Sequence, residues 1–125
     1  MLNFSVTFKS GSPVYEQVIY AVKKAIVSGQ LKAGDAFPSV RELSKDLRIN
    51  PNTAQKIVTN LVQEKILEMR PGIGSVVSER SEATAEQRQN ILESEAERLV
   101  VEAKRLSILK KELLYAIQKH WGKDK

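Results

Sequence analysis

The sequence contains no cysteine and a single histidine, His120. Without cysteine there can be no disulfide and no thiolate metal site, and one histidine cannot build a metal site by itself. No apolar run approaches the ~20 residues that a helix needs to cross a bilayer. The first residues also lack the basic and then apolar stretches of a secretory signal. We therefore expect a cytoplasmic protein with no metal, no other cofactor and no membrane partner.

Catalytic constellations are missing as well. The chain has no recognisable serine–histidine–aspartate set, no phosphate-binding loop and no paired carboxylates on an identifiable scaffold. The two glycines of Gly72-Ile73-Gly74 are too short a motif to bind a nucleotide. We expect a protein that is not an enzyme.

What is present is a small excess of positive charge near the N-terminus. The 125 residues carry a net charge of +5. Residues 1–78 hold ten Lys/Arg against six Asp/Glu, a net charge of +4, whereas residues 79–125 hold ten against nine, a net charge of +1. Positive charge favours an anionic partner such as nucleic acid, although many ordinary domains are equally basic.

The chain divides into two regions of different composition. Residues 1–78 contain all four prolines and five of the six glycines, which predicts several short elements with marked ends. Residues 79–121 contain neither, and they are rich in Glu, Lys, Arg, Ala and Leu, which predicts long helix. We expect an N-terminal domain over residues 1–78 and a helical tail over residues 79–125.

The N-terminal domain begins with a predicted strand and a helix. Residues 4–8 alternate apolar and polar side chains, which is typical of a short strand. Ser12 and Pro13 suit the cap and first position of a helix that Gly29 would end. The apolar stripe expected on this helix is Val14, Val18, Ala21, Val22 and Ala25.

Two further helices and a hairpin follow. Ser39 and Glu42 have the spacing of a capping box, and Asn50-Pro51 starts another helix after a tight connection. Alternation then resumes on both sides of a loop over residues 71–74, which predicts a β-hairpin. Helix, short helix, tight turn, helix and hairpin is the order of a winged helix-turn-helix.

The helix that begins at Asn50-Pro51 is the expected DNA-recognition helix. In a helix-turn-helix the second helix lies in the major groove, and its N-terminal residues face base edges. No Asp or Glu occurs between Leu47 and Gln63, so this stretch can approach phosphates without like-charge repulsion. An ordinary solvated face usually carries carboxylates, so we favour DNA contact. The outward residues are Asn52, Gln55, Lys56 and Thr59.

Two further sites, one on each side of this helix in the sequence, are candidate DNA contacts. For each of them a purely structural role is the alternative. Ser39 and Arg41 open a helix and suit a phosphate contact, but capping plus a surface charge explains them equally well. Arg70 and Gly72 lie near the hairpin tip, from which an arginine can reach the minor groove. The alternative there is a surface arginine beside a structural turn.

Four segments in this order carry a family resemblance: PVYEQ at 13–17, GDAFPSVREL at 34–43, NPNT at 50–53 and GIGS at 72–75. Together they resemble the GntR family of bacterial transcription regulators. The resemblance covers residues 13–77 and implies binding to a double-stranded DNA operator. It implies contacts from Arg41 and Gly72 and from the segment Asn50 to Lys56, which adds Asn50, Pro51 and Thr53 to the site. The chain departs from the family at Pro71, where a basic residue is common, and at Val76, where an aromatic residue is common.

The tail carries an apolar seam. Leu92, Leu99, Leu106 and Leu113 recur every seven residues, and Ala96, Ala103 and Ile117 follow three of them by four. Such a seam must be buried against another surface. The helix either folds back on its own winged helix or meets a second copy, and so apolar a tail is more often an interface.

The tail is too short for the large effector-binding or aminotransferase-like domain of most GntR members. It resembles the YtrA subfamily, whose tail is a helical dimerisation element. Lys104–Ile108 resembles that subfamily's turn between two helices, so we expect a break near Leu106–Ile108, with one continuous helix as the alternative. No effector is indicated.

The sequence thus predicts a mainly α protein with a small β-hairpin wing, a winged helix-turn-helix followed by a helical dimerisation tail. We expect a sequence-specific regulator, a repressor that binds a pseudo-palindromic operator as a homodimer. The alternative is a protein–protein interaction module built on the same scaffold.

Overall fold

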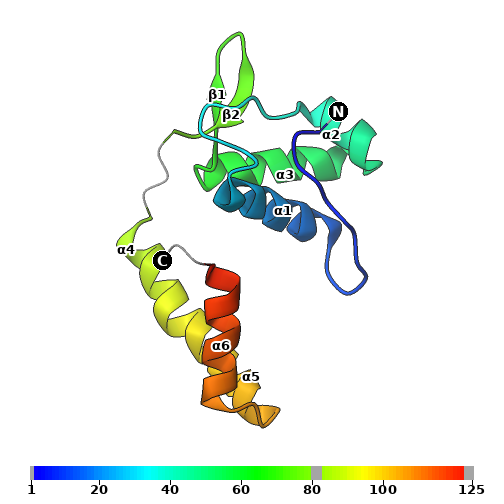
Figure 1. Ribbon diagram of the computed structural model, residues 1–125. Coiled ribbons are helices and arrows are strands. Elements are labelled where there is room, and N and C mark those ends of the chain that lie inside the picture. Colours follow the sequence, from blue (N-terminus) through cyan, green and yellow to red (C-terminus); the bar gives the residue numbers. More distant parts are fainter. Residues whose placement is uncertain (1, 80–82, 123–125) are drawn as a thin grey trace. The chain divides into compact units, whose positions relative to one another are not determined.

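The computed structural model describes residues 2–79 and 83–122 (Figure 1). The chain forms two compact units, Met1–Ser81 and Glu82–Lys125. The described residues are mostly helical, with one two-stranded antiparallel sheet, as the sequence predicts. None of the described helices is long and apolar enough to span a membrane.

The first unit consists of the helices α1 (Val14–Ser28), α2 (Val40–Leu47) and α3 (Pro51–Gln63), followed by the strands β1 (Leu67–Arg70) and β2 (Gly74–Val77). Both α1 and α2 pack against α3, and α3 also packs against β1 (Figure 1). This element order confirms the winged helix-turn-helix. The main core side chains are Phe4, Val18, Val22, Ala25, Leu31, Phe37, Leu43, Ala54, Ile57, Val58, Leu61, Leu67 and Val77.

The start of α1 differs from the prediction. Pro13 is the N-cap residue and makes no side-chain cap, so Ser12 is not the cap. The side chain of Gln17 orders the preceding loop instead: its amide donates to the carbonyls of Lys9 and Ser12, and its oxygen accepts from the Lys9 N–H, all at 2.8–2.9 Å. The predicted end is correct, since Gly29 has a left-handed φ of 87°.

The buried face of α1 is rotated slightly from the predicted stripe. Val14 is 39% exposed, whereas Ile19, which was not assigned to the stripe, is only 9% exposed. The reason is geometric: Val22 lies near the centre of the buried face, and Val14 and Ile19 fall on its two edges.

The predicted strand at residues 4–8 is wrong. Phe4 is buried and stacks on Phe37 with ring centroids 5.6 Å apart, Val6 is half-buried and Phe8 is exposed. Of the three apolar side chains in the alternation, only Phe4 and Val6 therefore face the core. A strand also needs a partner for its backbone, and this segment is not paired with any described strand.

The predicted caps of α2 and α3 are confirmed. The Ser39 hydroxyl accepts from the Glu42 N–H at 3.1 Å, and the Glu42 carboxylate accepts from the Ser39 N–H at 2.9 Å. The Asn50 side chain accepts from the Asn52 N–H at 2.7 Å. Between these helices Arg48 adopts a left-handed conformation with φ 56°, which ends α2 and lets residues 48–50 connect it to α3.

The hairpin is the predicted wing. Its register runs from Leu67 opposite Val77 to Arg70 opposite Gly74. On the other side of β2, the Val77 N–H donates to the Asp35 carbonyl at 2.8 Å, and the segment before α2 thereby ties the wing to the core. Leu67 and Val77 are buried in that core, so the base of the wing packs into the core that the three helices form.

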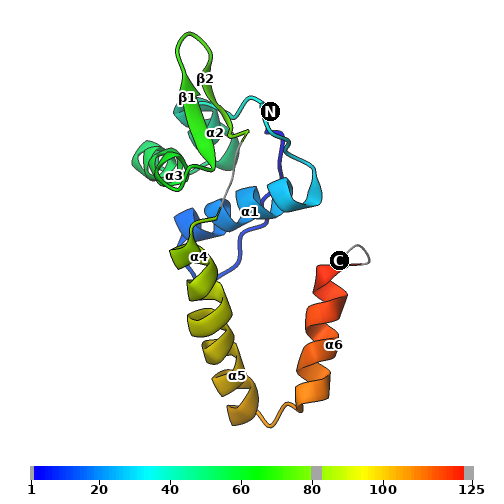
Figure 2. The same cartoon turned by 90° about the vertical axis from the view of Figure 1, so that its left-hand side faces the viewer.

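The second unit is a helical hairpin. A first arm consists of α4 (Ala85–Gln89), the π-helical turn η1 (Asn90–Glu95) and α5 (Ala96–Arg105), and the second arm is α6 (Lys110–Trp121). The expected break is confirmed, with Ser107 in a left-handed conformation at φ 59°. From this turn α5 and α6 spread apart (Figure 2). Among residues 83–122 only the side chain of Ala103 is buried.

Candidate nucleic-acid interface

The outward face of α3 is exposed and free of carboxylates. Asn50, Pro51, Asn52, Gln55, Lys56 and Thr59 are all exposed, and Thr53 is half-buried. The Gln55 amide donates to the Thr59 hydroxyl at 3.2 Å, so these two side chains lie together one helical turn apart. Amide and hydroxyl groups arranged in this way can donate to and accept from base edges.

The side chain of Lys56 lies at the edge of this face, against α1. Its ammonium lies 3.7 Å from the centroid of the Tyr15 ring on α1. A cation at this distance over an aromatic face is attracted by the ring quadrupole. The lysine is thus held against the first helix of the domain.

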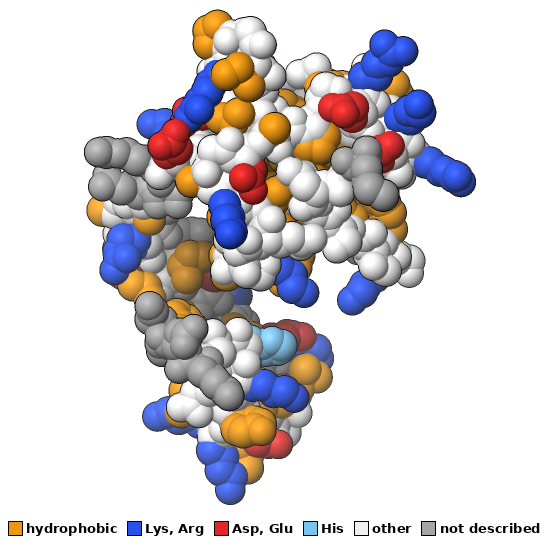
Figure 3. All heavy atoms as spheres, turned by 45° about the horizontal axis from the view of Figure 1, so that its top comes forward, with side chains coloured by type: hydrophobic (Ala, Val, Ile, Leu, Met, Phe, Trp, Pro, Cys, Tyr) orange, Lys and Arg blue, Asp and Glu red, His pale blue; other side chains and the backbone are white. Residues whose placement is uncertain are grey.

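The N-terminus of α2 provides a second basic position. Arg41 is exposed, and among the described residues it has no ion-pair partner. Ser39 is part of the capping box, and its hydrogen bonds to Glu42 lower the pKa of that carboxyl. Lys and Arg side chains project from the side of the unit where α2 lies (Figure 3).

At the wing, Arg70 turns toward the protein's own carboxylates. Its guanidinium donates to Glu79 at 2.6 Å and to Glu68 at 3.1 and 3.2 Å. These bonds raise the pKa of Arg70 and leave its positive charge compensated. At the loop itself Gly72 has a φ of 77°, a conformation that favours glycine.

The winged helix-turn-helix also has a sequence signature. The family model of bacterial regulatory proteins of the gntR family matches residues 14–77. The chain belongs to the GntR family.

GntR relatives extend the similarity into the tail. The chain is 35% identical to the HTH-type transcriptional repressor YtrA of Bacillus subtilis (strain 168), over 76% of this chain and 74% of that protein. It is 32% identical to the uncharacterized HTH-type transcriptional regulator YhcF of the same organism, over 89% of this chain and 92% of that protein. A solved GntR family transcriptional regulator from Listeria monocytogenes is similar with a TM-score of 0.68 and 28% identity, covering 90% of this chain and 98% of that one. The protein is therefore a GntR-family transcription regulator.

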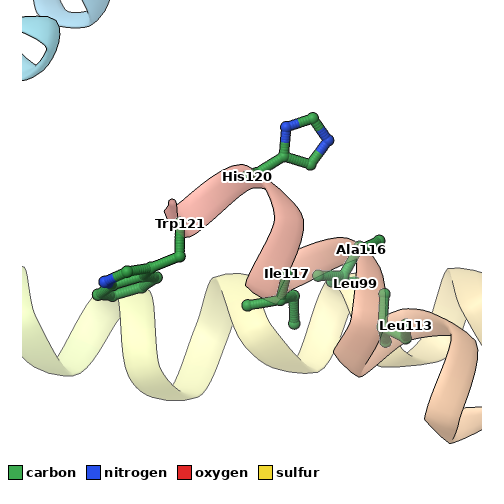
Figure 4. Close-up of a pocket in the computed structure, with 6 residues that line it drawn as sticks. All are labelled: Leu99, Leu113, Ala116, Ile117, His120 and Trp121. Atoms are coloured by element: carbon green, nitrogen blue, oxygen red, sulfur yellow. The ribbon is translucent and has the colours of Figure 1, made fainter. Parts of the chain in front are cut away.

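Most of the seam predicted on the GntR tail is open in the single chain. Ala103 is buried and Leu113 is half-buried, whereas Leu92, Ala96, Leu99, Leu106 and Ile117 are exposed. A groove of about 340 Å³ runs between the two arms (Figure 4). Its lining is Leu99 from α5 and Leu113, Ala116, Ile117, His120 and Trp121 from α6.

Two residues next to the predicted DNA contacts were missed by sequence reasoning. Tyr15 lies in one of the family segments but received no role, because nothing local links it to Lys56 on another helix. Glu79 was placed only at the domain boundary, and its approach to Arg70 depends on how the hairpin folds back. Both pairings arise from tertiary structure.

Proposed function

We propose that this GntR-family regulator is a cytoplasmic repressor that binds a pseudo-palindromic operator as a homodimer. The observation that carries the DNA-binding part is the exposed, carboxylate-free face of α3, capped at Asn50 and bearing Gln55 and Thr59 side by side. The repressor assignment is supported by the similarity to YtrA, which is named a transcriptional repressor.

In this proposal α3 occupies the major groove. Asn52, Gln55 and Thr59 face base edges, because they lie on the side of the helix opposite its buried stripe. Arg41 and Lys56 contact phosphates on the flanks of the groove, and the wing contributes its backbone at Gly72. Ser39 and Asn50 cap the N-termini of α2 and α3. In this proposal these two residues, together with Pro51 and Thr53 in the first turn of α3, lie within contact distance of the DNA backbone.

The tail of residues 79–125 supplies the dimer in this proposal, and residues 1–78 supply the DNA-binding domain. Helices of this length are marginal in water unless an apolar face is buried. In the single chain the two arms leave Leu99 47% and Ile117 39% exposed, and Trp121 is 65% exposed beside them. A second tail that fills the groove between the arms removes this apolar surface from water.

Selection of bound duplexes from a random pool tests the proposal without knowledge of the operator. A twofold-related pair of recognition helices should enrich a symmetric motif whose half-sites are about one helical turn apart. Enrichment of a single unrepeated half-site would contradict the dimer, and no enrichment at all would contradict sequence-specific binding.

The enriched motif then tests repression. Placed across the promoter of a reporter gene, it should lower transcription when the regulator is supplied. A duplicate reporter with a scrambled motif is the control, and increased transcription from the intact motif would instead assign an activator.

A further inference from the structure

The contact between Tyr15 and Lys56 joins two helices at the edge of the DNA-binding face. Tyr15 belongs to the first turn of α1, is half-buried and packs against the hydrophobic core. Lys56 is exposed on α3, and its ammonium lies 3.7 Å from the ring centroid. One partner is thus fixed by the core, and it orders the long side chain of the other.

The ring holds the lysine without neutralising it. An aromatic face attracts a cation through its quadrupole and carries no net charge, so the full positive charge stays available to a phosphate. Within the described part of the chain, no ion pair involves Lys56. Arg70 shows the opposite case, since Glu68 and Glu79 compensate its charge.

Helix geometry gives the direction in which Lys56 reaches. With 3.6 residues per turn, Gln55 and Lys56 lie on opposite sides of the exposed face of α3, and Asn52 and Thr59 lie between them. The Tyr15 contact shows that the Lys56 side is the one next to α1. The lysine is therefore directed toward the flank of the reading face, where a helix in the major groove meets the sugar–phosphate backbone.

We propose that Tyr15 is a positioning residue that holds Lys56 ready for contact with a DNA phosphate, so that α1 takes part in DNA binding through its first turn. This inference rests on the proposed placement of α3 in the major groove. It adds a residue and a role to that placement, because the ring fixes the ammonium before DNA arrives and reduces the entropy cost of binding.

A double-mutant cycle on a duplex of random sequence tests the proposal. The variants are Tyr15→Leu, Lys56→Gln and both together, with Tyr15→Phe as the conservative variant that keeps the ring. A phosphate contact is independent of sequence, so the operator need not be known. Affinity is measured over a range of salt concentrations, and thermal unfolding checks that each variant is folded.

We expect Lys56→Gln to weaken binding and to reduce the slope of log affinity against log salt by about 0.9 for each phosphate that is no longer neutralised. Tyr15→Leu should weaken binding about two- to fivefold while leaving that slope unchanged, since the lysine charge is still present. Tyr15→Phe should bind like the wild type. In the Lys56→Gln background, Tyr15→Leu should have no further effect.

Additive effects of the two substitutions would overturn the proposal, because Tyr15 would then act independently of Lys56. A Tyr15→Phe variant as weak as Tyr15→Leu would also overturn it by assigning the effect to the hydroxyl. If Tyr15→Leu does not fold, Tyr15→Met, which keeps most of the side-chain bulk but not the ring, takes its place in the cycle, and wild-type affinity of that variant would overturn the proposal. Failure of the wild type to bind any duplex would instead reject the proposed function itself.

Discussion

Single residues at this surface show two ways of holding a cation. Lys56 rests on the neutral ring of Tyr15, whereas Arg70 is clamped by the carboxylates of Glu68 and Glu79. A phosphate that approaches Arg70 must compete with these two carboxylates and is also repelled by them. On the proposed DNA-binding surface, the positive charge of Lys56 at α3 is therefore available to a phosphate, whereas the positive charge of Arg70 at the wing is offset by two carboxylates.

Replacement of Glu79 should make the wing more basic. We expect Glu79→Gln to raise affinity for DNA of any sequence about two- to fivefold at low salt, because one repulsive charge is removed and Arg70 is partly released. Fluorescence anisotropy with a labelled duplex measures this change. Glu64→Gln is the matched control, since Glu64 also forms a single exposed ion pair, with Lys23 at 3.2 Å. Equal gains in the two variants would mean that net charge alone is responsible.

Arg41 should behave as a phosphate contact. We expect Arg41→Ala to weaken binding by about 1–2 kcal/mol on specific and random duplexes alike, because a phosphate carries no sequence information. Lys24→Ala removes the same charge from the exposed side of α1 and serves as the control. Unchanged affinity of Arg41→Ala would remove this residue from the site.

Among the elements, α2 and α3 were the best predicted and the N-terminal segment the worst. The caps at Ser39 and Asn50 are made by residues within three positions of each other, so local sequence specifies them. The segment at residues 4–8 alternates as a strand would, but it has no strand partner among the described residues, and no local pattern reports on partners. The contact of Tyr15 with Lys56 could not be predicted from local sequence either, because it forms only when α1 packs on α3.

The reading function proposed for α3 can be separated from simple attraction to DNA. We expect Gln55→Ala to change which sequences are enriched in a selection experiment, while affinity for random duplexes falls little, because an amide pairs with base edges. The substitution also removes the 3.2 Å hydrogen bond to Thr59, so Thr59→Val is a useful companion variant. An equal decrease on selected and random duplexes would argue against base readout by Gln55.

The two units of the chain differ in how much apolar surface each one buries by itself. The first unit has a continuous core that joins α1, α2, α3 and the base of the wing. In the second unit, among the described residues, Ala103 alone is buried, and the arms leave an apolar groove between them. The heptad spacing predicted which side chains would share a face. It could not show what covers that face, because a single chain leaves most of it open.

Leu99→Glu should separate the proposed dimer. A carboxylate in the seam would have to give up its hydration when a second tail packs there, which is strongly unfavourable. Sedimentation should then report a monomer with weakened operator binding. Val101→Glu is the matched control, because Val101 is 59% exposed and lies on the opposite side of α5. An intact dimer in the Leu99→Glu variant would refute this seam.

The open groove of the tail has a consequence for how much regulator a cell needs. If the tail completes its core only against another copy, folding of the tail and occupancy of the operator both follow the law of mass action. Diluting the protein during growth, or degrading part of it, would then relieve repression more steeply than in proportion to copy number. Synthesis and turnover of the chain would themselves act as a control signal, without any small molecule.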